Sequence, residues 1–378
     1  MHAPAQPPTT DFRFPLIRSA IPRPEAWREL IDVAYRSGRF SNFGPLSRRL
    51  EDEFVARWGT QGTTCVLASS GTAAITAALI ATGVEGKVLV PAFTFPATLA
   101  AIRMAHATPI VIDVDPHDWR VSPAALDQAF AATGARAAVV VNPFGLMFDF
   151  SRHATVTSRR DAVLVIDNAA GLGVDRTPYE RDALVFEAYS LHATKPFGIG
   201  EGGAVFAHHK FEYRLRKALN FGLPDTATEP HWGINGKLAE FHAAVGLAVA
   251  RGFTDQLRTR QRLAARYIDV ASRFPGLSFC REPSHSAWQL FPILFPCPNS
   301  ADRFAQACAN LGMETRRYYS PSLSTIPECE VLEPCPVAES LARRMCCAPV
   351  YSHVDPAEYF ELSRILESAL HHALGAAS

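Results

Sequence analysis

Short apolar runs alternate with longer helical patterns over most of the first 250 residues. The expected strands lie at residues 88–90, 109–113, 137–142, 163–167, 185–190 and 204–207, and the expected helices at 72–81, 96–105 and 123–132. Strands that are continuously apolar and separated by helices are typical of a mainly parallel sheet with helices on both faces. We therefore predict an α/β fold built on such a sheet.

The rest of the chain predicts a smaller second domain. Residues 237–249 form a helical segment rich in alanine, and a second amphipathic helix is expected from Thr254, a reasonable N-cap, to Phe274. Beyond it we expect a strand at 288–295, a helix at 302–311, an extended piece at 314–319 and a final helix at 356–374. The predicted organisation is a disordered lead-in at 1–11, a large domain at 12–252, and a linking helix with a small α+β C-terminal domain at 253–378.

Composition argues against several classes of function. Lysine and arginine together number 37, as do aspartate and glutamate, so the formal net charge of +0 argues against nucleic acid or a membrane surface as a partner. No apolar run reaches the roughly 20 residues of a transmembrane helix, and the start lacks the pattern of a signal peptide. The eight cysteines form no Cys-x-x-Cys pair. We therefore expect reduced cysteines, no metal site and a cytoplasmic location.

Lys195 lies after a strand-like run and before a glycine-rich turn, in the segment 190–203 that reads SLHATKPFGIGEGG. Arginine supplies most of the positive charge of this chain, but it cannot be deprotonated near neutral pH and cannot form an imine. A lysine kept at this position suggests a Schiff base with pyridoxal 5'-phosphate (PLP), rather than a lysine that merely follows a strand. The other lysines are Lys87, Lys210, Lys217 and Lys237.

Such a cofactor needs a cradle for its phosphate and a carboxylate for its pyridine nitrogen. Residues 69–72, SSGT, precede a predicted helix whose N-terminus would attract phosphate, and Gly71 permits close approach, although the same residues could serve only as an N-cap. Asp167 ends a predicted strand and would keep the ring nitrogen protonated, or it could cap the next turn. Its neighbour Asn168 carries no charge.

An aromatic side chain would fix the plane of the cofactor ring. Phe93 and Phe95 in the segment 91–98, PAFTFPAT, are both candidates, and core packing is the alternative for each. Residues 198–203 also fit the dinucleotide pattern Gly-x-Gly-x-x-Gly, but that pattern has to follow a strand and open a helix. Because a strand is expected at 204–207, we reject a dinucleotide site.

Taken in order, these motifs resemble the DegT/DnrJ/EryC1/StrS family of PLP-dependent sugar aminotransferases, which has the fold type I (aspartate aminotransferase-like) architecture. The similarity covers most of the first 250 residues and is weaker at 314–319 and 348–351. It is carried by residues 38–45, 69–72, 90–95, 111–116, 165–170, 190–195, 201–203 and 233–240.

The resemblance assigns Lys195 as the lysine that forms the internal aldimine with PLP and transfers protons as general acid and base. It also implies a homodimer, because Asn235 matches an asparagine that reaches the cofactor phosphate of the partner subunit. The residues that would contact the cofactor are Gly71, Thr72, Phe95, Asp167, Ser190 and Asn235.

This chain departs from the family at residues 166–171, which read IDNAAG. The family commonly has Glu-Asp-Ala-Ala followed by Gln or His. Alignment on the carboxylate makes Asp167 the partner of the ring nitrogen, whereas alignment on the two alanines would place Asn168 there. We prefer Asp167, because a neutral partner would weaken the electron sink. The Gln or His at the ring edge is then missing.

The activity implied is transfer of an amino group from an amino acid, with L-glutamate the expected donor, to a nucleotide-linked keto sugar. One alternative is a sugar dehydratase of the same family, in which histidine replaces the lysine; another is a catalytically silent binding or regulatory relative. Lys195 argues against the first alternative. The second is disfavoured by the full set of Lys195, Asp167, Ser190 and Thr72. Possible substrate contacts, each also explained by packing or a surface ion pair, are His192, Arg316, Arg317, Tyr318 and Tyr319.

Overall fold

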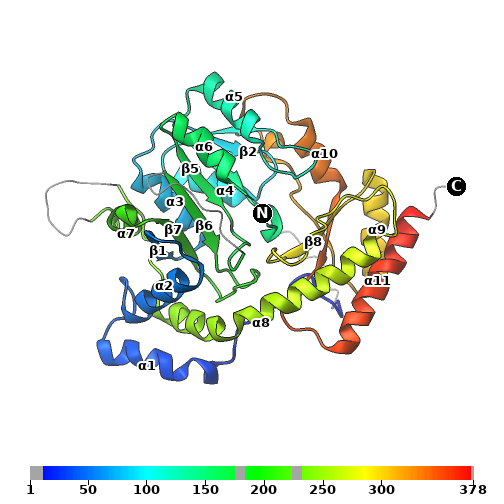
Figure 1. Ribbon diagram of the computed structural model, residues 1–378, viewed down its shortest axis with the longest axis horizontal. Coiled ribbons are helices and arrows are strands. Elements are labelled where there is room, and N and C mark those ends of the chain that lie inside the picture. Colours follow the sequence, from blue (N-terminus) through cyan, green and yellow to red (C-terminus); the bar gives the residue numbers. More distant parts are fainter. Residues whose placement is uncertain (1–11, 148, 175–183, 224–231, 376–378) are drawn as a thin grey trace, which may run out of the picture.

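A mainly parallel sheet forms the centre of the computed structural model, which describes residues 12–147, 149–174, 184–223 and 232–375 (Figure 1). Strand β7 is antiparallel to both of its neighbours, and the other described pairs are parallel. In spatial order the eight strands are β1 (Thr63–Ala68), β7 (Gly203–His208), β6 (Val185–Ser190), β5 (Val163–Asp167), β4 (Ala137–Val141), β2 (Lys87–Pro91), β3 (Thr108–Ile112) and β10 (Glu330–Val331).

Both faces of this sheet are buried, as the continuous apolar runs predict. Cys65 and Leu67 of β1 belong to one apolar cluster with residues of α2 (Pro45–Trp58) and α8 (Glu240–Ala271). Val66 belongs to the other cluster, because successive side chains of a strand point to opposite faces. The second cluster includes α3 (Gly71–Ala81), α4 (Pro96–Met104), α5 (Pro123–Thr133) and α7 (Glu212–Leu219).

The predicted elements of this part are confirmed, each boundary within one residue. Four further α-helices among the described residues of this part were not predicted: α1 (Arg28–Ser37), α2, α6 (Ser151–Arg159) and α7. The segment 198–203 leads into β7 and not into a helix, so it has the structural context that led us to reject a dinucleotide site.

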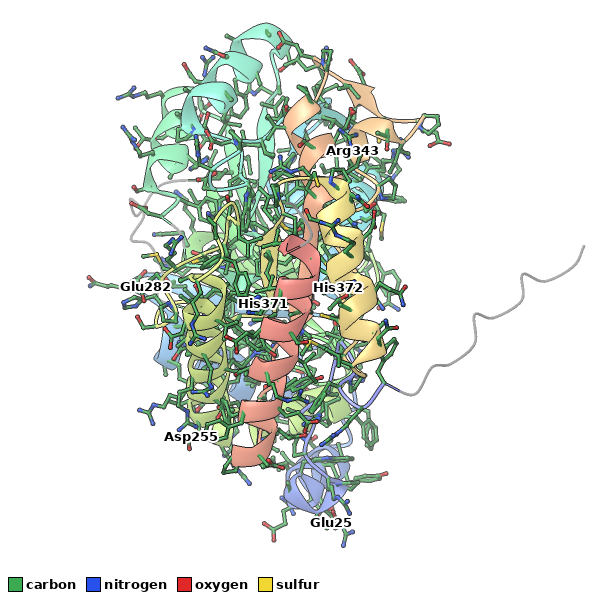
Figure 2. All side chains as sticks on the ribbon, turned by 90° about the vertical axis from the view of Figure 1, so that its right-hand side faces the viewer. Glu25, Asp255, Glu282, Arg343, His371 and His372 are labelled. Atoms are coloured by element: carbon green, nitrogen blue, oxygen red, sulfur yellow. The ribbon has the colours of Figure 1, made fainter. Side chains whose placement is uncertain are left out.

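A small antiparallel sheet and three helices make up most of the C-terminal part. The sheet has the order β8 (Leu290–Leu294), β11 (Met345–Pro349), β9 (Arg316–Arg317). Helix α11 (Pro356–Leu374) lies alongside α8 and α9 (Pro298–Asn310), and its last turn carries the labelled His371 and His372 (Figure 2). The remaining helix is α10 (Pro336–Arg344). The final helix is confirmed residue for residue, but α9 begins earlier than predicted, because Cys297 and Ser300 cap it.

Helix α8 corrects one prediction. The two helices expected at 237–249 and 254–274 are one continuous helix, so Thr254 lies inside it and is not an N-cap. A glycine inside a helix costs only about 1 kcal/mol relative to alanine. Gly252 therefore does not break a helix whose buried face continues from Val249 to Phe253. The predicted boundary between residues 252 and 253 falls inside α8, and the predicted lead-in at 1–11 lies outside the described residues.

No helix within the described part of the chain has both the length and the apolar character needed to cross a membrane.

Candidate active site

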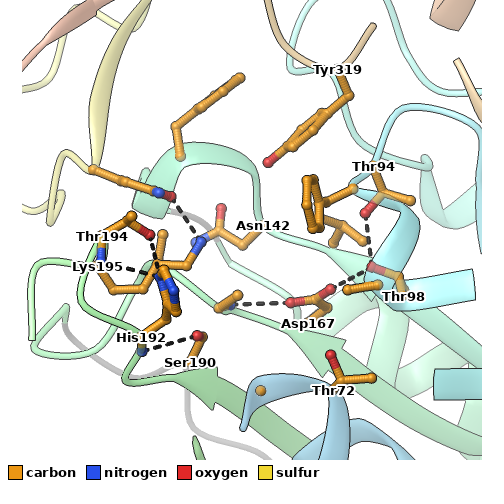
Figure 3. A pocket seen from close by; sticks show the side chains of 18 of the residues that line it. Thr72, Thr94, Thr98, Asn142, Asp167, Ser190, His192, Thr194, Lys195 and Tyr319 are labelled. Atoms are coloured by element: carbon orange, nitrogen blue, oxygen red, sulfur yellow. Dashed lines mark hydrogen bonds between the residues drawn. The ribbon is translucent and has the colours of Figure 1, made fainter. Parts of the chain in front are cut away.

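A cavity of about 380 Å³ opens at the carboxyl ends of β4, β5 and β6 (Figure 3). This is the edge where open α/β sheets bind ligands, and the volume lies in the range of small-molecule sites. The N-terminal turn of α3 lies on one side, and Gln289 and Leu290 come from the C-terminal part. The lining includes most of the predicted residues, namely Gly71, Thr72, Phe95, Asp167, Ser190, His192, Lys195, Arg316, Tyr318 and Tyr319.

Lys195 lies in the turn between β6 and β7. The turn is held by hydrogen bonds from the Lys195 N–H to the His192 carbonyl at 2.8 Å and from the Ala193 N–H to the Gly200 carbonyl at 2.8 Å. The Lys195 amine donates to Oε1 of Gln289 at 3.2 Å. Desolvation lowers the pKa of Lys195 to about 8, although the nearby charge of Asp167 opposes the change. A substantial fraction of the amine is therefore neutral and nucleophilic near physiological pH.

Asp167 is a buried carboxylate with one strong hydrogen bond in the cavity. Its side chain is 7% exposed, and its Oδ2 accepts a hydrogen bond of 2.7 Å from the Thr98 hydroxyl. Burial raises the pKa of Asp167, while Thr98 and the charge of Lys195 lower it. A cationic ring nitrogen beside this carboxylate would stabilise its ionised form, so the site suits a protonated pyridine.

Asn168 is held by other polar side chains. Its Oδ1 accepts a hydrogen bond of 2.8 Å from Asn142, and its Nδ2 donates to the Tyr189 hydroxyl at 3.4 Å. Of the two neighbours, Asp167 is therefore the one whose side chain lines the cavity.

The start of α3 approaches Ser190 at the end of β6. A Cβ added to Gly71 would lie 2.9 Å from the Ser190 Cβ, so only glycine permits this approach. The Ser70 hydroxyl caps the helix by accepting from the Ala73 N–H at 3.1 Å. Both readings of the SSGT motif are thus compatible. Ser70 is an N-cap, while Gly71 and Thr72 bring the positive end of the helix to the cavity.

The two candidate aromatic residues have different environments. Phe93 is 1% exposed and packs against Tyr319, with ring centroids 5.0 Å apart, so it belongs to the core. Phe95 is 57% exposed and lines the cavity as the residue before α4. Only Phe95 presents a free face to a ligand.

The two arginines that were candidates for substrate contact also have different environments. Arg316 lines the cavity and is exposed, 3.4 Å from the Glu314 carboxylate. Arg317 is engaged elsewhere, with the carboxylate of Asp302 and the Pro298 carbonyl.

His192 lines the cavity and has a defined ring orientation. Its Nδ1 accepts a hydrogen bond of 3.2 Å from the Thr194 N–H, and its Nε2 lies 3.5 Å from the Glu201 carboxylate. Asn235 is exposed and lies outside this cavity; it forms an isolated bridge with Asn220.

Comparison with known proteins identifies the family. The family model described as the DegT/DnrJ/EryC1/StrS aminotransferase family matches residues 24–367. The chain belongs to this family. The predicted family and enzyme class are thereby confirmed.

Relatives of this DegT/DnrJ/EryC1/StrS chain extend over most of its length. Protein Rv3402c of Mycobacterium tuberculosis (strain ATCC 25618 / H37Rv) is 29% identical, covering 91% of this chain and 87% of the relative. A Shigella dysenteriae protein named dTDP-4-amino-4,6-dideoxy-D-glucose transaminase is 27% identical, covering 88% and 93%. The crystal structure of DesI in the presence of its TDP-sugar product is 26% identical, with a TM-score of 0.82 over 95% of this chain and 92% of DesI. The fold class is thereby confirmed.

Several polar residues that line this aminotransferase-family site were not predicted, among them Thr98, Asn142 and Gln289. Thr98 lies inside the quoted PAFTFPAT motif, where its spacing of one helical turn from Thr94 could have drawn attention. Asn142 follows β4, and its position at a strand end gave a weak signal. Gln289 lies 94 positions after Lys195, and nothing in the sequence connects the two.

Proposed function

We propose that this aminotransferase uses PLP to transfer an amino group from an amino acid, with L-glutamate the expected donor, to a nucleotide-linked keto sugar. The observation that carries the proposal is the shared cavity of Lys195, with its pKa lowered to about 8, and the buried carboxylate of Asp167. A reactive amine and a buried anion are the two groups that this cofactor requires of a protein.

The residues present fit the cofactor. Gly71, Thr72 and Ser190 would hold its phosphate at the start of α3, and Phe95 would cover one face of its ring. Asp167 would keep the ring nitrogen protonated. When bound, PLP supplies an aldehyde for the amino group and a ring that withdraws electrons. Lys195 would then move a proton between the α-carbon of the amino-acid donor and the C4' carbon of the cofactor.

The proposed sugar substrate is supported by two relatives whose names specify nucleotide sugars. Arg316, which is exposed and lines the cavity, would bind a diphosphate, because a guanidinium group can donate two parallel hydrogen bonds to phosphate oxygens. We also propose His192, Tyr318 and Tyr319 as contacts to the sugar, because all three line the cavity. Arg317 is no longer proposed as a contact, since Asp302 engages it.

We propose a homodimer in which Asn235 completes the partner's site. Asn235 is exposed and lies outside the cavity of its own chain, as a residue that serves a second chain must. Exposed aromatic side chains occur near this segment: Trp232 is 60% exposed and Phe241 43%.

The dehydratase alternative would require a histidine where this chain has Lys195. The silent relative is disfavoured by the lowered pKa of Lys195, because burying an amine destabilises its charged form without benefit to a protein that performs no amine chemistry.

Borohydride trapping tests the proposal. The purified protein is reduced in the presence of PLP, digested and mapped, and the pyridoxyl group is expected on Lys195. A second measurement follows the absorbance of the bound cofactor when glutamate is added. Label on Lys237 or Lys217, or on no lysine, would overturn the role of Lys195. Correct label without a response to any amino acid would point to the silent relative.

A further inference from the structure

Gln289 links the C-terminal part of the chain to the reactive lysine. Its Oε1 lies 3.2 Å from the Lys195 Nζ, and the side chain is only 9% exposed. An amide oxygen can only accept, so the lysine is the donor in this pair.

The backbone of Gln289 is fixed from two directions. Its N–H donates to the Phe144 carbonyl at 2.9 Å, and its carbonyl accepts from Arg260 Nη2 at 2.9 Å. Two residues earlier, the Ala287 N–H donates to the Gly145 carbonyl at 2.7 Å. Gly145 has a φ of 70°, and a Cβ there would lie 2.3 Å from the Ala170 carbonyl oxygen. Only glycine is therefore tolerated at this position, whose carbonyl accepts from Ala287.

Arg260 of α8 holds the residue before Gln289 in an unfavourable conformation. Trp288 has a φ of 52°, which is strained for a bulky side chain. Arg260 is 4% exposed, and its Nε and Nη2 donate to the Trp288 carbonyl at 3.0 and 2.7 Å. A buried guanidinium thus stabilises the turn that directs the next side chain into the cavity.

We propose that Gln289 is a positioning residue for Lys195, whose amine it holds in one orientation and whose protonated form it favours. The ammonium has three N–H donors, and one points at Gln289. The neutral amine keeps its lone pair turned away from the Gln289 oxygen, toward the rest of the cavity. The value of this orientation for the reaction rests on the function proposed above, but the contact itself does not.

The test measures the titration of Lys195 in the full-length protein freed of cofactor. Reductive methylation with formaldehyde and cyanoborohydride is followed from pH 6 to 10, and peptide mapping resolves the five lysines. Loss of an acceptor from a charged donor should lower the midpoint of Lys195 in Gln289→Leu by about one pH unit, a tenfold change in the neutral fraction. Gln289→Glu adds a negative charge and should move the midpoint the other way.

Gln256→Leu is the matched control, because Gln256 is also 9% exposed and lies outside the cavity. In that variant the Lys195 midpoint should stay unchanged, and Lys87 and Lys210 should be unaffected throughout. Should the leucine variant not fold, Gln289→Asn, one methylene shorter, replaces it. Equal midpoints in the wild type and in both Gln289 variants would overturn the proposal. That result is independent of borohydride trapping, which tests Lys195 itself.

Discussion

At the residue scale, Asp167 and Asn168 are neighbours with different surroundings. Replacing Asp167 by Asn removes the buried charge while preserving size. We expect the transamination rate to fall by at least about 100-fold, because an electrostatic contact of this kind contributes that much to catalysis. The measurement is single-turnover kinetics with glutamate, followed by cofactor absorbance.

Asn168→Ala is the matched control for that prediction. The Asn168 side chain forms hydrogen bonds with Asn142 and Tyr189, so its loss should lower the free energy of unfolding. The transamination rate should fall much less than in Asp167→Asn. If Asn168→Ala proved the more damaging change to the rate, the ring nitrogen would be held by a different group from the one proposed.

Thr98 should set the acid limit of cofactor binding. Its hydroxyl lowers the pKa of Asp167, which burial raises. Thr98→Val removes this hydrogen bond, so the carboxylate should become protonated at a higher pH. Affinity for PLP, measured by absorbance titration between pH 4.5 and 8, should therefore begin to fall up to about one pH unit earlier on acidification.

Thr94→Val provides the comparison, because Thr94 contacts Thr98 at 3.0 Å rather than Asp167. Its acid limit should move less. Identical acid limits in the wild type and in Thr98→Val would mean that Asp167 does not govern the binding.

At the element scale, Glu240 joins two helices. This first residue of α8 is fully buried, and its carboxylate accepts from the Leu46 and Ser47 N–H groups of α2 at 2.7 and 2.9 Å and from the Ser47 hydroxyl at 2.5 Å. Glu240→Ala should lower the free energy of unfolding by about 3 kcal/mol, because buried donors lose their acceptor. Urea denaturation measures this change.

Glu367→Ala is the surface control for Glu240→Ala. Glu367 forms an exposed pair with Arg273 at 2.7 Å, and exposed pairs contribute less than about 1 kcal/mol. Equal losses of unfolding free energy in the two variants would show that the buried cap of Glu240 on α2 contributes no more than an exposed ion pair.

The elements that the sequence predicts well are those whose burial follows from local pattern. Strand β5 is apolar on both faces and buried at each of its five residues, so a single window of sequence identifies it. Helix α8 was divided in the prediction, because Gly252 and Thr254 suggest a break. The packing that carries the helix through them involves α2 and the C-terminal part, which local pattern does not contain.

For the site residues too, how well a position can be predicted depends on how far along the chain its contacts lie. Lys195 and Asp167 could be predicted because each ends a strand or follows one, where the sheet directs side chains to one edge. Ser190 was predicted only from the resemblance to the family. Gln289 could not be, because its place depends on Arg260 and on docking against Phe144, both remote in sequence.

At the scale of the whole molecule, sharing of sites between subunits can be tested by mixing two inactive variants, Lys195→Ala and Asn235→Glu. A mixed dimer would have one site with both defects and one with neither. After random exchange of subunits, up to about a quarter of the wild-type activity should return, as a symmetric pair requires.

That experiment needs proof that subunits exchanged, which native mass spectrometry of tagged chains provides. Both variants must also fold, as judged by circular dichroism. Exchange without any return of activity would mean that each chain builds its own site.

Helix α8 has a consequence for how the molecule opens. Its 32 residues, Glu240–Ala271, span about 48 Å. Its first residue caps α2, and near its other end the ring of Tyr267 packs on Phe291 of the small sheet, with ring centroids 5.3 Å apart. Because α8 packs against elements of both the large and the small sheet, neither sheet can unfold without disrupting this helix. We therefore expect one cooperative unit in native-state hydrogen exchange, with the slowest amides of β5 and β8 sharing one opening free energy. Two distinct opening free energies for β5 and β8 would show that the large and the small sheet open separately, with α8 unfolding only in part. A helix shared by the two sheets would then not give them the same stability.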